Sequence, residues 1–160
     1  MIKPVLVWPD PILLTATKSW DFYNPPMNYW DLENDLRDTL LGQSALGLAA
    51  NQIGIQFRVL AINTQKDNTI RIMYNPEILY TDSNLEEGQE GCLSFPKLRL
   101  EIERPKTVTV RWLDHFQYVH SMDLTGIDAR CILHEIDHLN GKVFKDYVSD
   151  LRFRRAWNKI

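Results

Sequence analysis

Residues 134–138 read His134-Glu135-Ile136-Asp137-His138, an H-E-x-x-H sequence inside a helix-like segment. Residues four apart share one face of an α-helix, so the two imidazoles can bind a single metal ion. Glu135 lies beside them, where a carboxylate can take a proton from a water molecule on the metal. The pattern predicts a metal-dependent hydrolase built on this helix. The alternative is a solvated helix face with chance spacing.

Both ends of this helix are marked in the sequence. Thr125-Gly126-Ile127-Asp128 resembles a capping box, with Thr125 as N-cap and the Asp128 carboxylate near the positive end of the helix dipole. Asn140-Gly141 supplies a stop signal at the other end. We therefore expect a capped helix of roughly 15 residues that carries both histidines.

The rest of the chain predicts helices near its two ends and strands between them. A helix is expected over Asn28–Leu41, where leucines recur every four residues. Segments rich in β-branched and aromatic residues predict strands at Phe57–Ile62, Ile70–Tyr74, Thr107–Trp112 and Gln117–Leu124. Short helices are expected at Asp10–Thr17 and Leu151–Trp157. The prediction is an α+β fold, with antiparallel strands packed around a central H-E-x-x-H helix in one catalytic domain over residues 1–160.

Composition narrows the classes of function. Hydrophobic residues make up 44% of the 160 residues and charged residues 24%, an ordinary globular balance. The net charge of −3 gives no reason to expect specific DNA binding. No segment approaches the roughly 20 apolar residues that span a membrane, and the N-terminus lacks the apolar stretch of a signal peptide. We expect a cytoplasmic protein with no membrane partner.

Two cysteines are candidates for a third metal ligand, and in a reducing cytosol a disulfide between them is the less common outcome. Cys131 shares the helical face of His134 but lies roughly 10 Å along the axis from His138. Ligand atoms around one tetrahedral metal lie only about 3–4 Å apart, which disfavours Cys131. Cys92 follows a glycine in what reads as a short loop, Glu90–Ser94. It would complete a Cys-His-His site with one open position, although a buried inert cysteine remains the alternative.

Three blocks of the chain resemble the peptide deformylase family. Residues 46–54, Leu-Gly-Leu-Ala-Ala-Asn-Gln-Ile-Gly, look like the block G-x-G-L-A-A-x-Q, residues 90–94 look like E-G-C-L-S, and residues 134–139 look like H-E-x-D-H-L. Their order and spacing also agree with the family, over most of the chain. The resemblance implies hydrolysis of the N-formyl group from the initiator formylmethionine of nascent polypeptides, with release of formate.

The resemblance implies a metal centre and an acid–base residue. Cys92, His134 and His138 would hold one divalent metal ion, Fe²⁺ in the cell, with Zn²⁺, Ni²⁺ or Co²⁺ as substitutes. Glu135 would act as the general base and then deliver a proton to the leaving amine.

The resemblance also implies an oxyanion hole and a peptide groove. The side-chain amide of Gln52 and the backbone N–H of Leu93 would stabilise charge on the formyl oxygen. The alternative for Gln52 is a surface amide. Arg99 would lie along the peptide groove, and the alternative for Arg99 is a solvated charge. The residues expected to pair with the substrate backbone, like an added strand, are Leu46, Gly47 and Gly91.

Two residues depart from the family pattern. Ala45 replaces the first glycine of the first block, and a positive φ there would strain alanine by roughly 1–2 kcal/mol. Leu133 stands where the family often has glutamine. Among the supporting residues, we expect Arg104 to pair with Asp137 and fix the helix, with Glu90 joining them; a plain surface ion pair is the alternative.

The C-terminal segment after the metal helix is short. Leu151–Ile160 carries three arginines, which predict either a weak contact with the ribosome or a solvated face. Together with the resemblance, this favours a short family member with a truncated C-terminus, of the kind that a phage could encode. The expected partners are N-formylmethionyl nascent peptides.

Two rival functions fit the H-E-x-x-H sequence less well. A zincin-type endopeptidase usually takes its third ligand from a downstream histidine or glutamate, and none follows His138. A non-catalytic metal-binding module would need neither Glu135 nor Gln52. Both residues therefore favour the enzyme.

Overall fold

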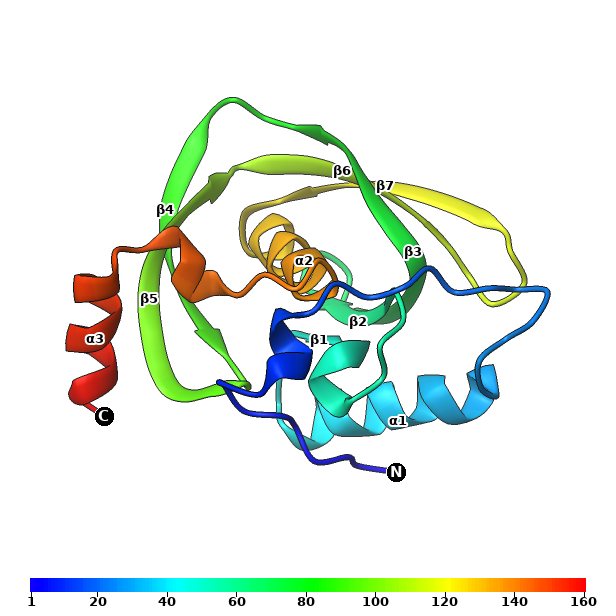
Figure 1. Ribbon diagram of the computed structural model, residues 1–160. Coiled ribbons are helices and arrows are strands. Elements are labelled where there is room, and N and C mark those ends of the chain that lie inside the picture. The colour runs from blue at the N-terminus through cyan, green and yellow to red at the C-terminus, as the bar shows by residue number, and fades with distance from the viewer.

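The computed structural model describes residues 1–160 and contains two antiparallel sheets arranged around helix α2 (Figure 1). The larger sheet has the strand order β1-β2-β3-β6-β7, formed by Gly47–Ala49, Val59–Thr64, Thr69–Thr81, Thr107–Leu113 and Val119–Thr125. The smaller sheet is the hairpin of β4, Leu85–Cys92, and β5, Phe95–Pro105. The helices are α1 Tyr29–Gly42, α2 Gly126–Leu139 and α3 Asp150–Asn158, with 3₁₀ turns η1 Pro11–Leu14, η2 Ala50–Ile53 and η3 Phe144–Tyr147. The predicted α+β fold around the H-E-x-x-H helix is confirmed.

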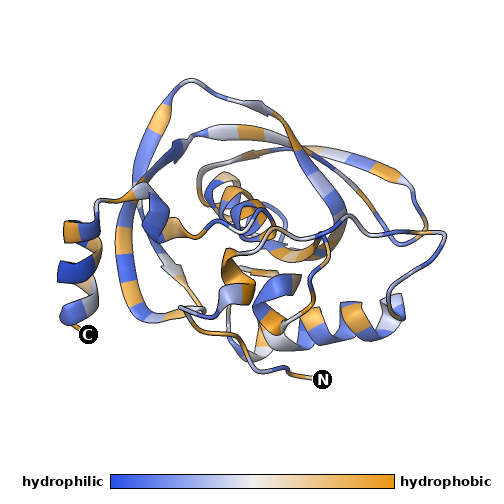
Figure 2. Cartoon of the chain, in the orientation of Figure 1, coloured by the Kyte–Doolittle hydropathy of each residue, from blue (hydrophilic) through white to orange (hydrophobic).

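One helix covers each face of the larger sheet near β2. Successive side chains of a strand point to opposite faces, so Leu60 joins the core around Ile132 of α2, while Ala61 joins the core around Leu36 of α1. Figure 2 shows apolar and polar residues mixed along both helices, as expected for helices with one buried side. Because β2 is covered on both faces, its first four residues, Val59–Ile62, are all apolar. The packing of α2 on one of these faces holds the helix at the centre of the molecule.

The N-terminal end of α2 differs from the prediction. Thr125 is the N-cap residue, but its side chain makes no capping hydrogen bond. Asp128 instead accepts hydrogen bonds from the backbone N–H groups of Gln65 and Lys66, at 2.8 and 3.1 Å, and so ties the helix to the turn after β2. The predicted capping box is therefore wrong. The Asp128 carboxylate binds the backbone of residues 65 and 66 in another segment, and does not close a box with Thr125. The predicted stop is confirmed, since α2 ends before Asn140 and Gly141 has a φ of 74°.

The hairpin of β4 and β5 is the main element that the sequence did not predict. Cys92 is the last residue of β4 and lies in a strand, whereas a loop was expected; the connection to β5 is only Leu93–Ser94. Only Glu90 of β4 is buried, so the strand shows no apolar alternation. In β5, Leu98, Leu100 and Ile102 alternate with charged residues, a signal that could have been used.

Both ends of the chain pack against β5. Trp8 stacks on Phe95 with ring centroids 5.7 Å apart and meets Phe153 and Trp157 of α3 edge-on, at 5.3 and 5.5 Å. Phe144 packs on the same Phe95 ring. This aromatic cluster holds the hairpin, and with it Cys92, and through Phe144 it also contacts His134 of α2. The helices of the chain include none that is long and apolar enough to cross a membrane.

Candidate active site

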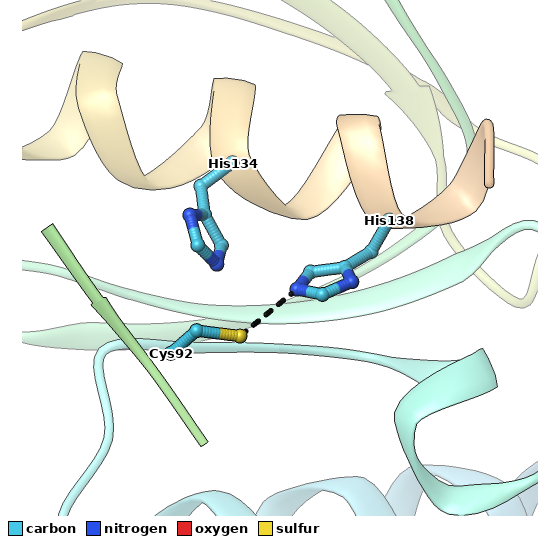
Figure 3. A group of neighbouring side chains, drawn as sticks. All are labelled: Cys92, His134 and His138. Carbon is cyan, nitrogen blue, oxygen red and sulfur yellow. Dashed lines mark hydrogen bonds between the residues drawn. The ribbon is translucent and has the colours of Figure 1, made fainter. Parts of the chain in front are cut away.

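Three side chains from two elements converge on one point beside α2 (Figure 3). Cys92 comes from the end of β4, and His134 and His138 lie one turn apart on α2. Their ligand atoms all lie within 4.8 Å of one another, and Cys92 Sγ is 3.3 Å from His138 Nε2. One thiolate and two imidazoles are a donor set that suits Zn²⁺, Fe²⁺, Ni²⁺ and Co²⁺, and three protein ligands leave a position for water or substrate. The residues present therefore fit a divalent metal.

The orientation of His134 is set by a buried carboxylate. His134 Nδ1 donates to Glu90 Oε1 at 2.9 Å. Figure 3 shows the other ring nitrogen directed toward Cys92 and His138. A carboxylate on the far nitrogen is the usual partner of a metal-binding histidine, because it fixes the ring and makes the ligand nitrogen more basic.

Two arginines hold Glu90 in place. Arg104 donates Nε and Nη2 to the two carboxylate oxygens at 2.8 and 2.9 Å, and Arg130 donates Nη1 to Oε2 at 2.9 Å. Burial by itself raises the pKa of the Glu90 carboxyl, but the hydrogen bonds from Arg104 and His134 outweigh it and hold the pKa at about 2. Glu90 therefore stays charged beside His134.

The same network reaches the end of the metal helix. Arg104 also donates Nη1 to Asp137 Oδ2 at 2.7 Å, so the expected pairing of Arg104 with Asp137 and Glu90 is confirmed. Arg104 is only 3% exposed, which excludes the surface ion pair. Arg130 was missed by the sequence reasoning. It also donates to backbone carbonyls of both hairpin strands, Glu86 and Ile102, each at 2.7 Å, and so ties the hairpin to α2.

Glu135 lies deep in the site with one oxygen free. Its Oε2 is buried and has no hydrogen-bond partner in the protein. Burial raises the pKa of the Glu135 carboxyl to about 7, with His134 opposing this rise and Glu90 adding to it. A cation held by Cys92 and the two histidines would lower that pKa again. The pKa of Glu135 therefore depends on its burial and on the charges of the neighbouring groups.

Gly47 makes room for Glu135. A Cβ atom at position 47 would lie 2.7 Å from Glu135 Oε1 and 2.8 Å from Cys131 Sγ. The atoms that come closest to this glycine therefore belong to side chains of α2. Cys131 packs against the core beside α2 as a free cysteine, outside the group of three ligand residues, and burial raises its thiol pKa.

Gln52 is a buried amide held at both ends. Its Oε1 accepts the N–H of Ala49 at 2.9 Å, and its Nε2 donates to Ser94 Oγ at 3.1 Å and points toward Cys92 Sγ, 3.7 Å away. Gln52 is 1% exposed, so the surface alternative is wrong. The N–H of Leu93 donates no hydrogen bond to another backbone or side-chain atom. Two donors thus flank the ligand group.

A cleft of about 650 Å³ opens over these residues. Strand β1 is at the edge of the larger sheet, so one side of its backbone has no strand beside it. His138 is buried and does not line the cleft. The other residues predicted to bind the metal, act in catalysis or contact the substrate all line it: Leu46, Gly47, Gln52, Gly91, Cys92, Leu93, Arg99, His134 and Glu135.

The two departures from the family pattern cause no visible strain. The positive φ in this loop, 51°, belongs to Ser44, and Ala45 has none. Ala45 packs against the core beneath α1, and Leu133 packs against the core beside α2. The conditional expectation of a strained Ala45 is therefore not met.

Comparisons with known proteins agree on one family. A sequence model described as polypeptide deformylase matches residues 2–154. The peptide deformylase of Mesorhizobium japonicum is 38% identical over 94% of this chain and 86% of its own length, and that of Brucella suis is 36% identical over 94% and 87%. These relatives are bacterial, and they give no support to the expectation of a phage-encoded form.

Solved structures agree with the sequence relatives. A peptide deformylase from Legionella pneumophila is 35% identical and superposes with a TM-score of 0.90 over 99% of this chain and 95% of its own. The enzyme from Thermotoga maritima is 33% identical, with a TM-score of 0.86 over 93% and 99%. A class I type b enzyme from Acinetobacter baumannii, crystallised with Met-Ala-Ser, is 30% identical, with a TM-score of 0.84 over 92% and 99%.

Proposed function

Because the chain belongs to the polypeptide deformylase family, and is thus a metallohydrolase that removes the N-formyl group from nascent polypeptides, we propose which of its residues performs each part of that reaction. The observation that supports the division is the group of Cys92, His134 and His138 beside a buried carboxylate with a free oxygen. These three residues hold the metal. When bound, it supplies positive charge that acidifies water and polarises the formyl carbonyl. We propose Fe²⁺ as the metal in the cell, with Zn²⁺, Ni²⁺ or Co²⁺ as substitutes.

Glu135 moves the proton. Its free Oε2 accepts a proton from the attacking water and then returns it to the amine that leaves. Amide cleavage needs this second transfer because an unprotonated amine anion is a very poor leaving group. Burial next to Gly47 supports the role, since it keeps the carboxylate close to the reacting atoms and away from bulk water.

Gln52 and Leu93 stabilise the charge that grows on the formyl oxygen. The Gln52 amide is held rigidly by Ala49 and Ser94, so its Nε2 needs no reorganisation during the reaction. The Leu93 N–H has no partner within the protein and adds a second donor. Preorganised neutral donors of this kind stabilise an oxyanion without competing for the metal.

The substrate backbone adds a strand in the cleft. Leu46 and Gly47 continue the free edge of β1, and Gly91 lies on β4 across the cleft, so a peptide between them can pair in an extended form. Arg99 flanks the same path. The formylmethionine end then reaches the ligand residues, and the rest of the peptide leaves along the groove.

We also propose a cellular location and a further partner. Residues 1–160 act as one catalytic domain in the cytoplasm, where formylated chains are made. The exposed arginines of α3, Arg152, Arg154 and Arg155, make a weak contact with the ribosome.

The test compares wild type with Glu135→Gln on formyl-Met-Ala-Ser, measuring formate release and bound metal in protein purified without oxygen. We expect Glu135→Gln to keep its metal and lose about 10²–10⁴-fold in rate, the usual contribution of a general acid–base. A wild type that binds metal and releases no formate contradicts the assignment and favours a non-catalytic metal-binding module. Glu77→Gln, on the exposed part of β3, is the matched control.

A further inference from the structure

Strand β5 carries extra residues opposite Cys92. Gly91 pairs with Arg99 and Cys92 pairs with Phe95, so Pro96, Lys97 and Leu98 have no partner on β4. Lys97 adopts a left-handed backbone there, with a φ of 66°. Bulges beside active sites redirect side chains. Here Lys97 and Arg99 both line the cleft, and we call these two residues the cationic rim.

The charges of the cationic rim are not neutralised within the protein. Both side chains are exposed, and neither forms an ion pair with a carboxylate. Arg99 lies against Gly91, where an added Cβ would be 2.7 Å from Nη1. Glu101, next on the exposed side of β5, does not line the cleft.

The other charged groups of the cleft are already committed. Its carboxylates are Glu90 and Glu135: Glu90 is saturated by two arginines and His134, and Glu135 is buried beside the ligand group. The guanidinium of Arg130 is occupied by Glu90 and backbone carbonyls. The remaining polar side chains near the mouth are neutral: Gln43, Ser44 and Gln89. The outer cleft is therefore positive, with only neutral polar groups facing the rim.

We propose that the cationic rim makes this enzyme favour formylated peptides that carry a carboxylate within a few residues after the formylmethionine. The inference rests on the proposed path of the substrate, since a peptide paired with Gly91 passes Arg99, its register partner. Exposed charge pairs change an equilibrium by about 1.5- to 5-fold each, so the expected preference is of that size per cation.

The experiment uses formyl-Met-Ala-Ala-Ala peptides with an amidated C-terminus, in which Asp, Asn or Lys replaces each alanine in turn. The measured quantity is kcat/KM at low ionic strength. We expect Asp to exceed Asn by about 1.5- to 5-fold at one or two positions and Lys to fall below Asn. In about 1 M salt the Debye length is only ~3 Å, so the preference should disappear. A free-acid series without Asp tests whether a C-terminal carboxylate serves equally well.

Two variants test whether the rim causes the preference. Lys97→Asn removes the charge with a residue that tolerates the left-handed conformation, and it should lower the Asp-to-Asn ratio, whatever it does to the absolute rate. Arg99→Gln should also lower that ratio, whatever it does to the absolute rate. Lys66→Asn, an equal charge change in the turn between β2 and β3, is the control and should leave the ratio unchanged.

The outcomes distinguish failure of the cationic rim from failure of the proposed catalytic roles. An Asp-to-Asn ratio of one or less at every position, or one that survives both rim variants, overturns the role of the rim. Failure of the wild type to deformylate even the neutral Asn peptides overturns the proposed division of the reaction instead.

Discussion

At the scale of single residues, Gln52 uses both ends of one amide. Its oxygen is needed by Ala49, and its nitrogen is the proposed oxyanion donor. Gln52→Glu keeps an acceptor for the Ala49 N–H and removes the donor. We expect kcat on formyl-Met-Ala-Ser to fall by about 10²–10³ with the fold retained, because one oxyanion donor contributes that much.

Gln43→Glu is the control for Gln52→Glu, because it adds the same charge at the mouth of the cleft. Steady-state kinetics and circular dichroism of both variants check the prediction. A loss of less than tenfold in Gln52→Glu would remove Gln52 from the reaction and leave it a packing role only.

Gly47 tests how closely Glu135 must be held. In Gly47→Ala the new methyl group meets Glu135 Oε1 and Cys131 Sγ below 3 Å, so the carboxylate has to move. A displacement near 1 Å can lower a rate by about 10²-fold, and we expect a fall of that order in kcat. Gly42→Ala is the control, since its methyl group meets only the flexible side chain of Ile2. Equal activity in the two variants would contradict the prediction.

At the scale of elements, the buried arginine network joins the hairpin to α2. Arg104→Met leaves the buried Glu90 and the partly buried Asp137 without their shared partner. We expect this variant to lose about 3–5 kcal/mol of unfolding free energy, as is usual when one side of a buried ion pair is removed. Arg111→Met, which breaks the exposed pair with Glu77, is expected to change stability by about 1 kcal/mol or less.

Urea unfolding of the metal-free proteins measures both changes without interference from metal binding. A loss of similar size in the Arg104 and Arg111 variants would mean that the network is no more important than a surface pair. Reduced metal content in the Arg104 variant is a further expected result, because Glu90 orients His134.

Elements with a regular buried face could be predicted from the sequence, and the others could not. The leucines of α1 and the apolar spacing of α2 follow directly from burial on one side. Only Glu90 of strand β4 is buried, so no apolar pattern in the sequence indicates a strand. Gly91 near its end is typical of a loop. β5 does alternate, so a strand could have been predicted there from the sequence.

The ligand and supporting residues divide in the same way. Cys92 and Gln52 could be chosen through a resemblance in short motifs, and local spacing sufficed for the histidines. Arg130 could not be found, because its role depends on backbone carbonyls of Glu86 and Ile102, and no residue type marks an acceptor carbonyl in a sequence. The bulge that aims Lys97 is a matter of register, which the sequence alone does not reveal.

At the scale of the whole molecule, the β4–β5 hairpin and helix α2 meet at the candidate ligand residues, so metal removal should affect stability as well as activity. A ligand that binds only the folded state at 1,000 times its dissociation constant adds about 4 kcal/mol. We expect a chelator to lower the unfolding free energy of the wild type by up to that amount. The readout is chemical unfolding with and without chelator.

Cys92→Ala is the control for metal removal. It lacks one of the three donor atoms, so its stability should respond weakly to the chelator. A wild type whose unfolding is indifferent to chelation would show that the hairpin and α2 hold together without help from a bound metal.

The distance along the chain between the ligand residues gives the site a further property. Cys92 and His138 are 46 positions apart, so a metal that stayed attached to both would close a large chain loop when the hairpin separates from α2. By the loop-closure entropy used for disulfides, such a link restricts the unfolded chain by about 4 kcal/mol. The protein has no disulfide, since both its cysteines are free thiols. A metal ion held by Cys92 and His138 would thus also act as a removable cross-link, and a chain that unfolded without losing the ion would refold from a smaller set of conformations.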